Sequence, residues 1–90
     1  MGKVDCIGIS GMELYFNSLD HLPWHFHARK PDEWEIRVLF MTCTDDALDF
    51  ELIWKRRSGP SGDDRRDLLA HVLQHRAELL EEWGKKVCPR

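Results

Sequence analysis

The chain has 90 residues, which is enough for one domain (residues 1–90) and too few for a second. Hydrophobic residues make up 42% and charged residues 32%, fractions typical of a globular domain. The formal net charge is −3, from 13 Lys and Arg against 16 Asp and Glu. This balance argues against a general nucleic-acid-binding protein and leaves room for local basic patches.

The cysteines and the N-terminal residues indicate the cellular compartment of the protein. Cys6, Cys43 and Cys88 are odd in number and share no CxxC spacing, and no signal-peptide segment stands at the N-terminus. No apolar run approaches the roughly 18 residues that a membrane span needs. We therefore expect a cytoplasmic protein with no membrane contact. A nucleophilic cysteine is disfavoured, because the spacing shows no base beside Cys43 or Cys88.

Alternation of apolar and polar residues predicts strands within residues 12–16, 24–29, 34–40 and 48–54. Short polar or turn-forming stretches separate them. A period of two gives each strand one apolar and one polar face. The apolar set of the last strand is Leu48, Phe50, Leu52 and Trp54. In the second strand, His25, His27 and Arg29 lie opposite Trp24, Phe26 and Ala28.

One long helix is predicted from about Asp63 to Trp83, with Ser61 or Asp63 as the N-cap and Gly84 just past its end. Its apolar residues fill one arc of roughly 140°. They are Leu68, Leu69, Val72, Leu73, Leu79, Leu80 and Trp83. The predicted fold class is α+β. An antiparallel sheet of three or four strands is covered on one face by the C-terminal helix, in the order β-β-β-β-α.

The segment 20–27 holds three of the five histidines and is the strongest candidate for a functional site. On a strand, His25 and His27 share a face and could hold a metal ion or a phosphate, with His21 folded over the same point. The alternative is a polar strand face whose histidines are solvated or bonded to Glu35 or Asp49. No cofactor is expected beyond a possible divalent metal at these histidines.

A second, weaker pair is His71 and His75, which lie with Glu78 and Glu82 on one flank of the predicted helix. The HExxH signature of zinc proteases is absent, so an exposed helix flank is the favoured interpretation. If the helix covers the apolar face of the sheet, this pair cannot share an ion with His25 and His27.

Arg76 falls in the middle of the apolar arc of the helix. A guanidinium buried there is unfavourable unless a carboxylate pairs with it, and Asp20, Glu13 and Glu35 are candidates. We expect Arg76 to be paired, forming a structural link to the loop before the histidine strand.

The basic residues Lys55–Arg57, with Arg65 and Arg66, could contact phosphate. Asp63 and Asp64 oppose them, and nucleic-acid binding needs several unopposed cations. We therefore do not expect these residues to bind nucleic acid, and we expect a protein partner instead.

Two stretches carry a family resemblance. Asp20-His21-Leu22-Pro23-Trp24-His25-Phe26-His27 resembles the D-H-x-P-P-H-F-H stretch of a small bacterial family, domain of unknown function 4160. His75-Arg76-Ala77-Glu78-Leu79-Leu80, with Trp83, resembles the H-R-x-E-L-L-x-x-W helix of that family. Gly8, Ile9 and Met12–Phe16 are similar to its opening strand. Trp24 stands where the family usually has a second proline.

The resemblance implies a prokaryotic or phage source. It also implies a gene that often stands beside one for another small protein, in an arrangement that looks like a toxin–antitoxin pair. It marks His21, His25, His27, His75 and Arg76 as a shared set, without assigning roles. It further implies that Arg76 meets Asp20 or His21 in space.

Three classes of function follow. The first is a binding module for a protein partner in a toxin–antitoxin-like or anti-defence setting, with Trp24 as an anchor. The second is a nuclease or hydrolase that uses His21, His25 and His27, with or without a metal, and Glu35 or Asp49 as acid or base. In the third, the histidines are structural and function lies on another surface. An exposed edge strand could also pair two copies of the chain.

Overall fold

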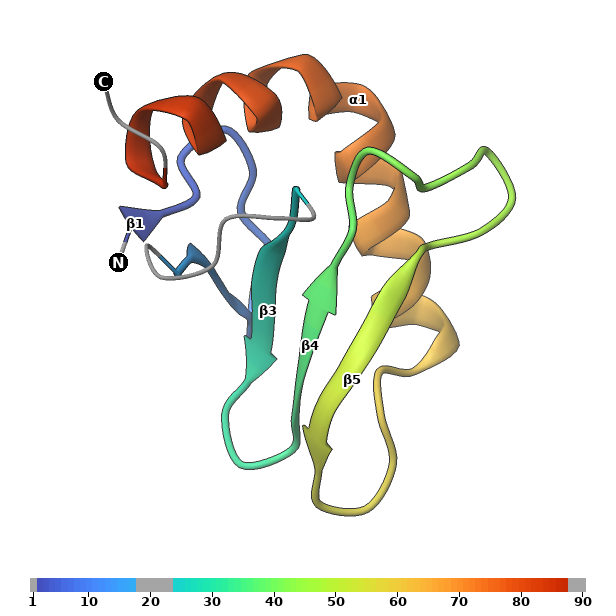
Figure 1. Cartoon of the computed structure of the whole chain (residues 1–90). Helices are drawn as coiled ribbons and strands as arrows, with labels where there is room; N and C mark the ends of the chain where they lie inside the picture. The colour runs from blue at the N-terminus through green and yellow to red at the C-terminus, as the bar shows by residue number, and fades with distance from the viewer. Residues whose placement is uncertain (1, 18–23, 88–90) are drawn as a thin grey trace.

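The computed structural model describes residues 2–17 and 24–87. The elements are β1 (Gly2–Lys3), β2 (Glu13–Phe16), β3 (Phe26–Lys30), β4 (Trp34–Val38), β5 (Phe50–Lys55) and α1 (Gly62–Lys86). The strands form one antiparallel sheet in the order β1-β2-β3-β4-β5, followed by the helix (Figure 1). The α+β class is confirmed.

Within residues 2–17 and 24–87 the sheet has five strands, so the prediction of three or four was too low. The additional strand is β1, whose Gly2 and Lys3 pair with Phe16 and Tyr15 of β2. Two residues are too few to show an alternating pattern, because alternation can be recognised only over about four or more positions.

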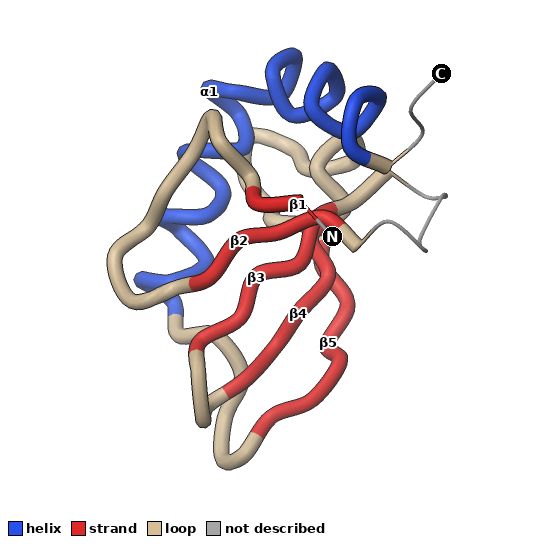
Figure 2. Tube along the Cα trace, turned by 90° about the vertical axis from the view of Figure 1, so that its left-hand side faces the viewer, coloured by secondary structure: helices blue, strands red, loops and turns tan. Residues whose placement is uncertain are grey.

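One hydrophobic core joins the sheet to the helix, which runs beside the strands (Figure 2). Alternate residues of β3 and β4 enter this core, as their period of two predicts. From the sheet these are Phe26, Ala28, Trp34, Ile36 and Val38, and from α1 they are Leu68, Val72, Leu79 and Trp83. All of these residues are at most 3% exposed, so the sheet and the helix bury their apolar faces against each other.

A bulge between β4 and β5 changes the face on which Trp54 lies. Glu35 pairs with Trp54 while the next residue, Ile36, pairs with Leu52, so Ile53 is one extra residue in β5. An extra residue shifts the alternation by one position. Trp54 therefore shares the face of Glu35, and its predicted place on the apolar face with Leu52 was wrong.

The helix begins as predicted and ends later. Ser61 is the N-cap and forms a capping box with Asp64, in which Ser61 Oγ accepts from Asp64 N at 3.1 Å. The helix continues through Gly84 to Lys86, with Val87 as the C-cap, so the prediction that it ends at about Trp83, with Gly84 just past its end, was wrong. Tertiary packing explains the extra turn, since Val87 is 3% exposed and belongs to the core.

The middle of α1 is kinked at His75, which has φ −119° and ψ 20°. Leu73 and Leu80 are 36% and 37% exposed, so the predicted apolar arc was too wide. At 100° per residue, the four buried positions of α1 fit within roughly 60°, and Leu73 and Leu80 lie outside that stripe. In the described part of the chain, no helix has the length and apolarity for a membrane span.

Two side chains of α1 hold the N-terminal segment. The Glu82 carboxylate accepts from the N–H groups of Asp5 and Cys6, each at 2.8 Å. Lys86 Nζ donates to the Lys3 carbonyl at 2.5 Å and to Asp5 Oδ2 at 2.7 Å. Burial alone would raise the pKa of Glu82, but hydrogen bonds from Cys6, Asp5 and Lys86 hold it at about 2.

Candidate functional site

The candidate site is built on the sheet face opposite the core, around His27 in the middle strand β3. In the antiparallel register, His27 lies opposite Tyr15 of β2 on one side and Arg37 of β4 on the other. Glu35 of β4 is the diagonal neighbour of His27, because it pairs with Arg29 two residues along. Residues at such positions share a face and are within reach of long side chains.

Tyr15, His27 and Glu35 form a compact polar group, which we call the Tyr15–His27–Glu35 cluster. The Tyr15 hydroxyl donates to Glu35 Oε2 at 2.8 Å, and His27 Nδ1 lies 3.3 Å from the same oxygen. The rings of Tyr15 and His27 stack with centroids 5.0 Å apart and an interplanar angle of 9°. Burial, followed by the hydrogen bond to Glu35, raises the pKa of Tyr15 to about 12.

His25 connects this cluster to the helix. Its ring lies 5.2 Å from that of His27 and 5.4 Å from that of Trp83, measured between centroids. Trp83 in turn makes an edge contact with Phe16 at 6.3 Å. His25 can contact Trp83 because the C-terminal part of α1 lies at the end of the sheet where β3 begins (Figure 1). His25 therefore contacts the helix through Trp83, whereas the predicted separation concerns His71 and His75 and stays a prediction.

Both histidines are buried, His25 at 2% and His27 at 5% exposure. A carboxylate beside an imidazole nitrogen orients the ring, an arrangement that enzymes use in acid–base catalysis. The same arrangement also satisfies buried polar groups on a sheet. The predicted contact of these histidines with Glu35 is present at His27, whereas Asp49 accepts from Thr42 Oγ1 in the turn before β5.

The helix histidines make local contacts. His71 Nδ1 lies 2.7 Å from the Asp67 carbonyl, and His75 Nδ1 lies 2.8 Å from Glu78 Oε1. These are neighbours one turn away along α1, in keeping with an ordinary helix flank. Within residues 2–17 and 24–87, no three His, Cys, Asp or Glu side chains come together as a group that could hold a metal ion. His21 lies outside these residues, so the His21, His25 and His27 set stays a prediction.

Arg76 lies just after the kink and is half-buried. Its guanidinium donates to the backbone carbonyl of Cys43 at 2.6 Å, which ties α1 to the turn before β5. Of the proposed partners, Glu13 pairs with Arg29 at 3.1 Å and Glu35 belongs to the Tyr15–His27–Glu35 cluster. Asp20 lies outside the described residues, so the Asp20–Arg76 pair stays a prediction.

The described cysteines are free thiols. Burial, with the Glu82 carboxylate adding to it, raises the pKa of Cys6 to about 12, and burial also raises the pKa of Cys43. The thiolate is the reactive form of cysteine, so these environments make both residues poor nucleophiles.

Sequence reasoning missed Tyr15 and Trp83 as members of the site. Tyr15 is the only tyrosine and falls on the polar face of its strand, which is a usable signal. Its contact with His27 depends on the register between β2 and β3, which no local pattern specifies. Trp83 was assigned to the core, where it lies, and its second contact with His25 depends on where the helix ends.

Comparison with known families gives one match, the family described as Domain of unknown function (DUF4160), over residues 11–84. This range contains all the described residues of the site and the whole length of α1 up to Gly84. Comparisons with curated proteins and with solved structures give no match. The two stretches that carry the resemblance meet in the structure, where His25 contacts Trp83.

Proposed function

The chain belongs to the family described as Domain of unknown function (DUF4160), and we propose that this member is a small binding module that acts on a protein partner. The observation that carries this proposal is the β5 apolar edge, which we define as Leu52, Ile53 and Trp54. These side chains are 46%, 43% and 39% exposed and are consecutive in a strand at the edge of the sheet. Exposed apolar side chains that adjoin one another indicate an interaction site.

The bulge makes this edge accessible from both sides. Leu52 shares the face of Ile36, whereas Trp54 shares the face of Glu35, and Ile53 is the extra residue between them. We further propose that α1 occupies only the face of Ile36, so that a partner can contact the opposite face through Trp54. A bulge also discourages continuous strand pairing, which favours recognition through side chains.

Trp24 is a second proposed contact, with 44% of its side chain exposed. The register aligns Phe26 with Val38 and Phe50, and Lys30 with Trp34 and Lys55. Trp24 therefore precedes the end of the sheet where β3 begins, while Trp54 lies near the other end. Substitutions at Trp24 and at the β5 apolar edge consequently report on different surfaces.

We place the module in the cytosol, because Cys6 and Cys43 are free thiols as in a reducing compartment. We assign the partner to a toxin–antitoxin-like or anti-defence pair, on the strength of the gene arrangement that the family implies. In such a pair the partner would be the small protein encoded beside this one.

Co-purification with the product of the adjacent gene tests the proposal. We expect a stable complex that Ile53→Asp weakens at least tenfold, about 1.4 kcal/mol. Leu80→Asp is the matched control, because Leu80 is similarly exposed on the helix, at 37%. A complex that forms equally well with both variants would contradict the role of the β5 apolar edge, and the absence of any complex would contradict the protein-binding function.

A second function is supported by one observation, the position of Glu35 Oε2 3.3 Å from His27 Nδ1. This pairing of carboxylate and imidazole suits acid–base cleavage of RNA by His25 and His27. The burial of both rings places this function second. RNA cleavage that is lost in His27→Gln, with the circular dichroism spectrum unchanged, would favour it over the binding module.

A further inference from the structure

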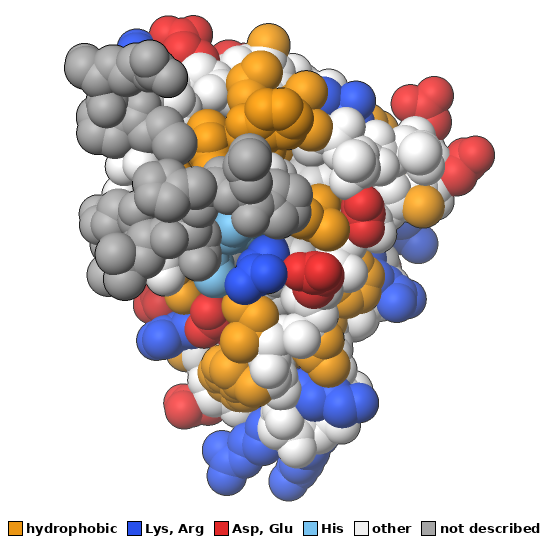
Figure 3. All heavy atoms as spheres, viewed as in Figure 1, with side chains coloured by type: hydrophobic (Ala, Val, Ile, Leu, Met, Phe, Trp, Pro, Cys, Tyr) orange, Lys and Arg blue, Asp and Glu red, His pale blue; other side chains and the backbone are white. Residues whose placement is uncertain are grey.

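Three cations follow the β5 apolar edge directly in the sequence. Lys55 is the last residue of β5, and Arg56 and Arg57 begin the loop to α1. All three residues are exposed. Figure 3 shows Lys and Arg side chains gathered at this end of the molecule, next to hydrophobic side chains.

These cations lack carboxylate partners within the described residues. No salt bridge joins Lys55, Arg56 or Arg57 to a carboxylate of residues 2–17 or 24–87, whereas most other Lys and Arg side chains there are paired. Glu33 and Asp64 lie 3.7 Å and 3.9 Å from Lys30 Nζ, and Asp32 lines a pocket with Arg56 and Arg57 without forming a salt bridge to them. The edge therefore carries three cations that no salt bridge within the described residues neutralises, on a protein whose net charge is −3.

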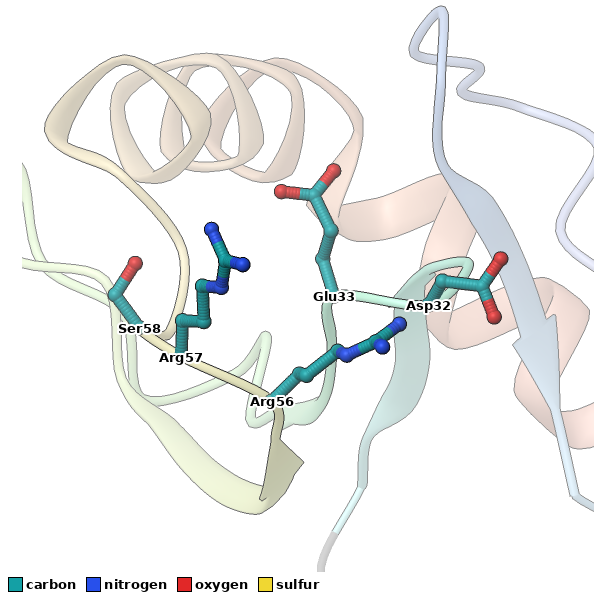
Figure 4. Close-up of a pocket in the computed structure, with 5 residues that line it drawn as sticks. All are labelled: Asp32, Glu33, Arg56, Arg57 and Ser58. Carbon is teal, nitrogen blue, oxygen red and sulfur yellow. The ribbon is translucent and has the colours of Figure 1, made fainter.

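The cations border a hollow. Arg56, Arg57 and Ser58, on the segment after β5, face Asp32 and Glu33 of the β3–β4 turn across a pocket of about 390 Å³ (Figure 4). The backbone N–H of Arg56 donates to the Glu33 carbonyl at 2.9 Å, which joins the two segments that line this pocket. The guanidinium groups of Arg56 and Arg57 are thus carried on a segment bonded to the β3–β4 turn, and they line the pocket together with the carboxylates of Asp32 and Glu33.

The backbone of β5 adds a second recognition feature. Leu39 N donates to the Asp49 carbonyl and Arg56 N to the Glu33 carbonyl, so Asp49 and Arg56 face β4. Antiparallel strands alternate in the direction of their hydrogen-bonding groups, so Phe50 and Leu52 turn theirs outward. No strand of the sheet lies beyond β5 among the described residues. A short extended segment can bond there before the bulge at Ile53 interrupts pairing.

We infer that the β5 edge, from Phe50 to Arg57, recognises an extended segment of a protein partner that combines apolar residues with a run of acidic residues. The apolar residues contact Leu52, Ile53 and Trp54, and the acidic run pairs with Lys55, Arg56 and Arg57. Charge complementarity selects the acidic partner, and unpaired backbone groups with apolar side chains select its extended form. This inference rests on the proposed protein-binding function and names the chemistry of the partner.

Peptide binding measured by fluorescence anisotropy tests the inference. The probe is the labelled peptide Glu-Glu-Glu-Val-Thr-Val-Thr-Glu-Glu-Glu, whose acidic runs at both ends allow either strand direction. One control peptide replaces every glutamate by lysine, and another replaces the central four residues by Gly-Ser repeats. We expect the first peptide to bind at least tenfold more tightly than either control, with affinity falling as the ionic strength rises.

Two matched pairs of variants locate the site. Arg57→Glu should weaken binding of the acidic peptide about tenfold. Lys85→Glu makes the same change in charge in the last turn of α1, far from β5 in the sequence, and should leave the binding unchanged. Ile53→Ser should weaken binding, whereas Leu80→Ser should not. All four positions are exposed, so the variants are expected to keep the fold.

Each other outcome overturns the inference in a recognisable way. Equal binding of the acidic and lysine peptides, or binding that Arg57→Glu does not weaken, would show that the edge does not recognise an acidic partner. The complex with the adjacent gene product would still test the protein-binding function independently. A single-stranded RNA oligonucleotide that binds more tightly than the acidic peptide would show that the three cations recognise nucleic acid instead. A dimer in sedimentation equilibrium that Ile53→Ser dissociates would assign the edge to a second copy of the chain.

Discussion

At the scale of single residues, Glu35 is the group that holds the Tyr15–His27–Glu35 cluster together. Its carboxylate is only 14% exposed and accepts from the Tyr15 hydroxyl at 2.8 Å, with His27 Nδ1 at 3.3 Å. A carboxylate removed from water needs such partners, because an unpaired buried charge is strongly unfavourable.

We predict that Tyr15→Phe destabilises the protein by about 1.5–3 kcal/mol, the usual contribution of a hydrogen bond to a charged group. The free energy of unfolding in urea measures it. Thr42→Val is the control, because the Thr42 hydroxyl also bonds to a carboxylate, that of Asp49, but on an exposed residue. A Tyr15→Phe variant as stable as the original would show that the cluster contributes little to folding.

The sequence predicts which residues lie on the polar face of this site more readily than it predicts which of them contact one another. The alternation over 24–29 places His27 and Arg29 on the face opposite Phe26 and Ala28, and this holds in β3. The burial of His25 depends on the Trp83 ring, 58 residues later in the chain, and on the path of α1 around the end of the sheet. Contacts of that range are set by tertiary packing and leave no local pattern.

At the scale of elements, the kink in α1 lies beside the contact between Arg76 and Cys43. His75 departs from helical geometry, and the next residue sends its guanidinium to the Cys43 carbonyl at 2.6 Å. This bond joins α1 to the turn before β5. It therefore influences how the β5 strand is held at its beginning.

We predict that Arg76→Ala destabilises the protein by about 1–2 kcal/mol, because it removes both this hydrogen bond and the packing of the half-buried side-chain stem. Thermal unfolding should show a fall of several degrees in Tm. Arg66→Ala should change Tm little, since the Arg66 side chain is 78% exposed and, among the described residues, pairs with Asp63 on its own helix. Equal Tm values for Arg76→Ala and the original protein would contradict the structural role of Arg76.

The strands and helix were predictable where their pattern is long and regular. The alternation over 34–40 and the N-cap at Ser61 both correspond to the observed elements. The bulge at Ile53 was not predictable, because Leu52-Ile53-Trp54-Lys55 contains no Gly or Pro that marks an extra residue. As a consequence, alternation alone assigned Trp54 to the core face, where the structure has Leu52.

At the scale of the whole molecule, the two ends of the chain are joined by charge. Glu82 of α1 accepts from the backbone N–H groups of Asp5 and Cys6. Lys86 donates to the Lys3 carbonyl and the Asp5 carboxylate, and its Nζ also lies 2.9 Å from Glu82 Oε1. These bonds close the domain across more than seventy residues of sequence. They also connect stability to pH, because the pKa of Glu82 is held at about 2 instead of 4.5.

We predict that Glu82→Gln costs about 1.5–3 kcal/mol at neutral pH and that this difference shrinks in acid. A carboxyl group with a lowered pKa in the folded state contributes stability that is present above pH 4.5 and is lost as the pH falls towards 2. Urea unfolding of both proteins from pH 7 to pH 2.5 measures the difference. A difference that stays constant over this range would mean that Glu82 keeps its ordinary pKa.

The measurement that tests the central claim most directly is the mapping of the partner's contact surface by NMR. The isotope-labelled chain would be titrated with the product of the adjacent gene, and backbone amide shifts recorded. We predict the largest changes at Leu52–Arg57, with small changes at His71 and Leu80 on the exposed side of α1. Changes centred on His25 and His27, with none along β5, would contradict the binding surface proposed here and move the function to the buried histidines.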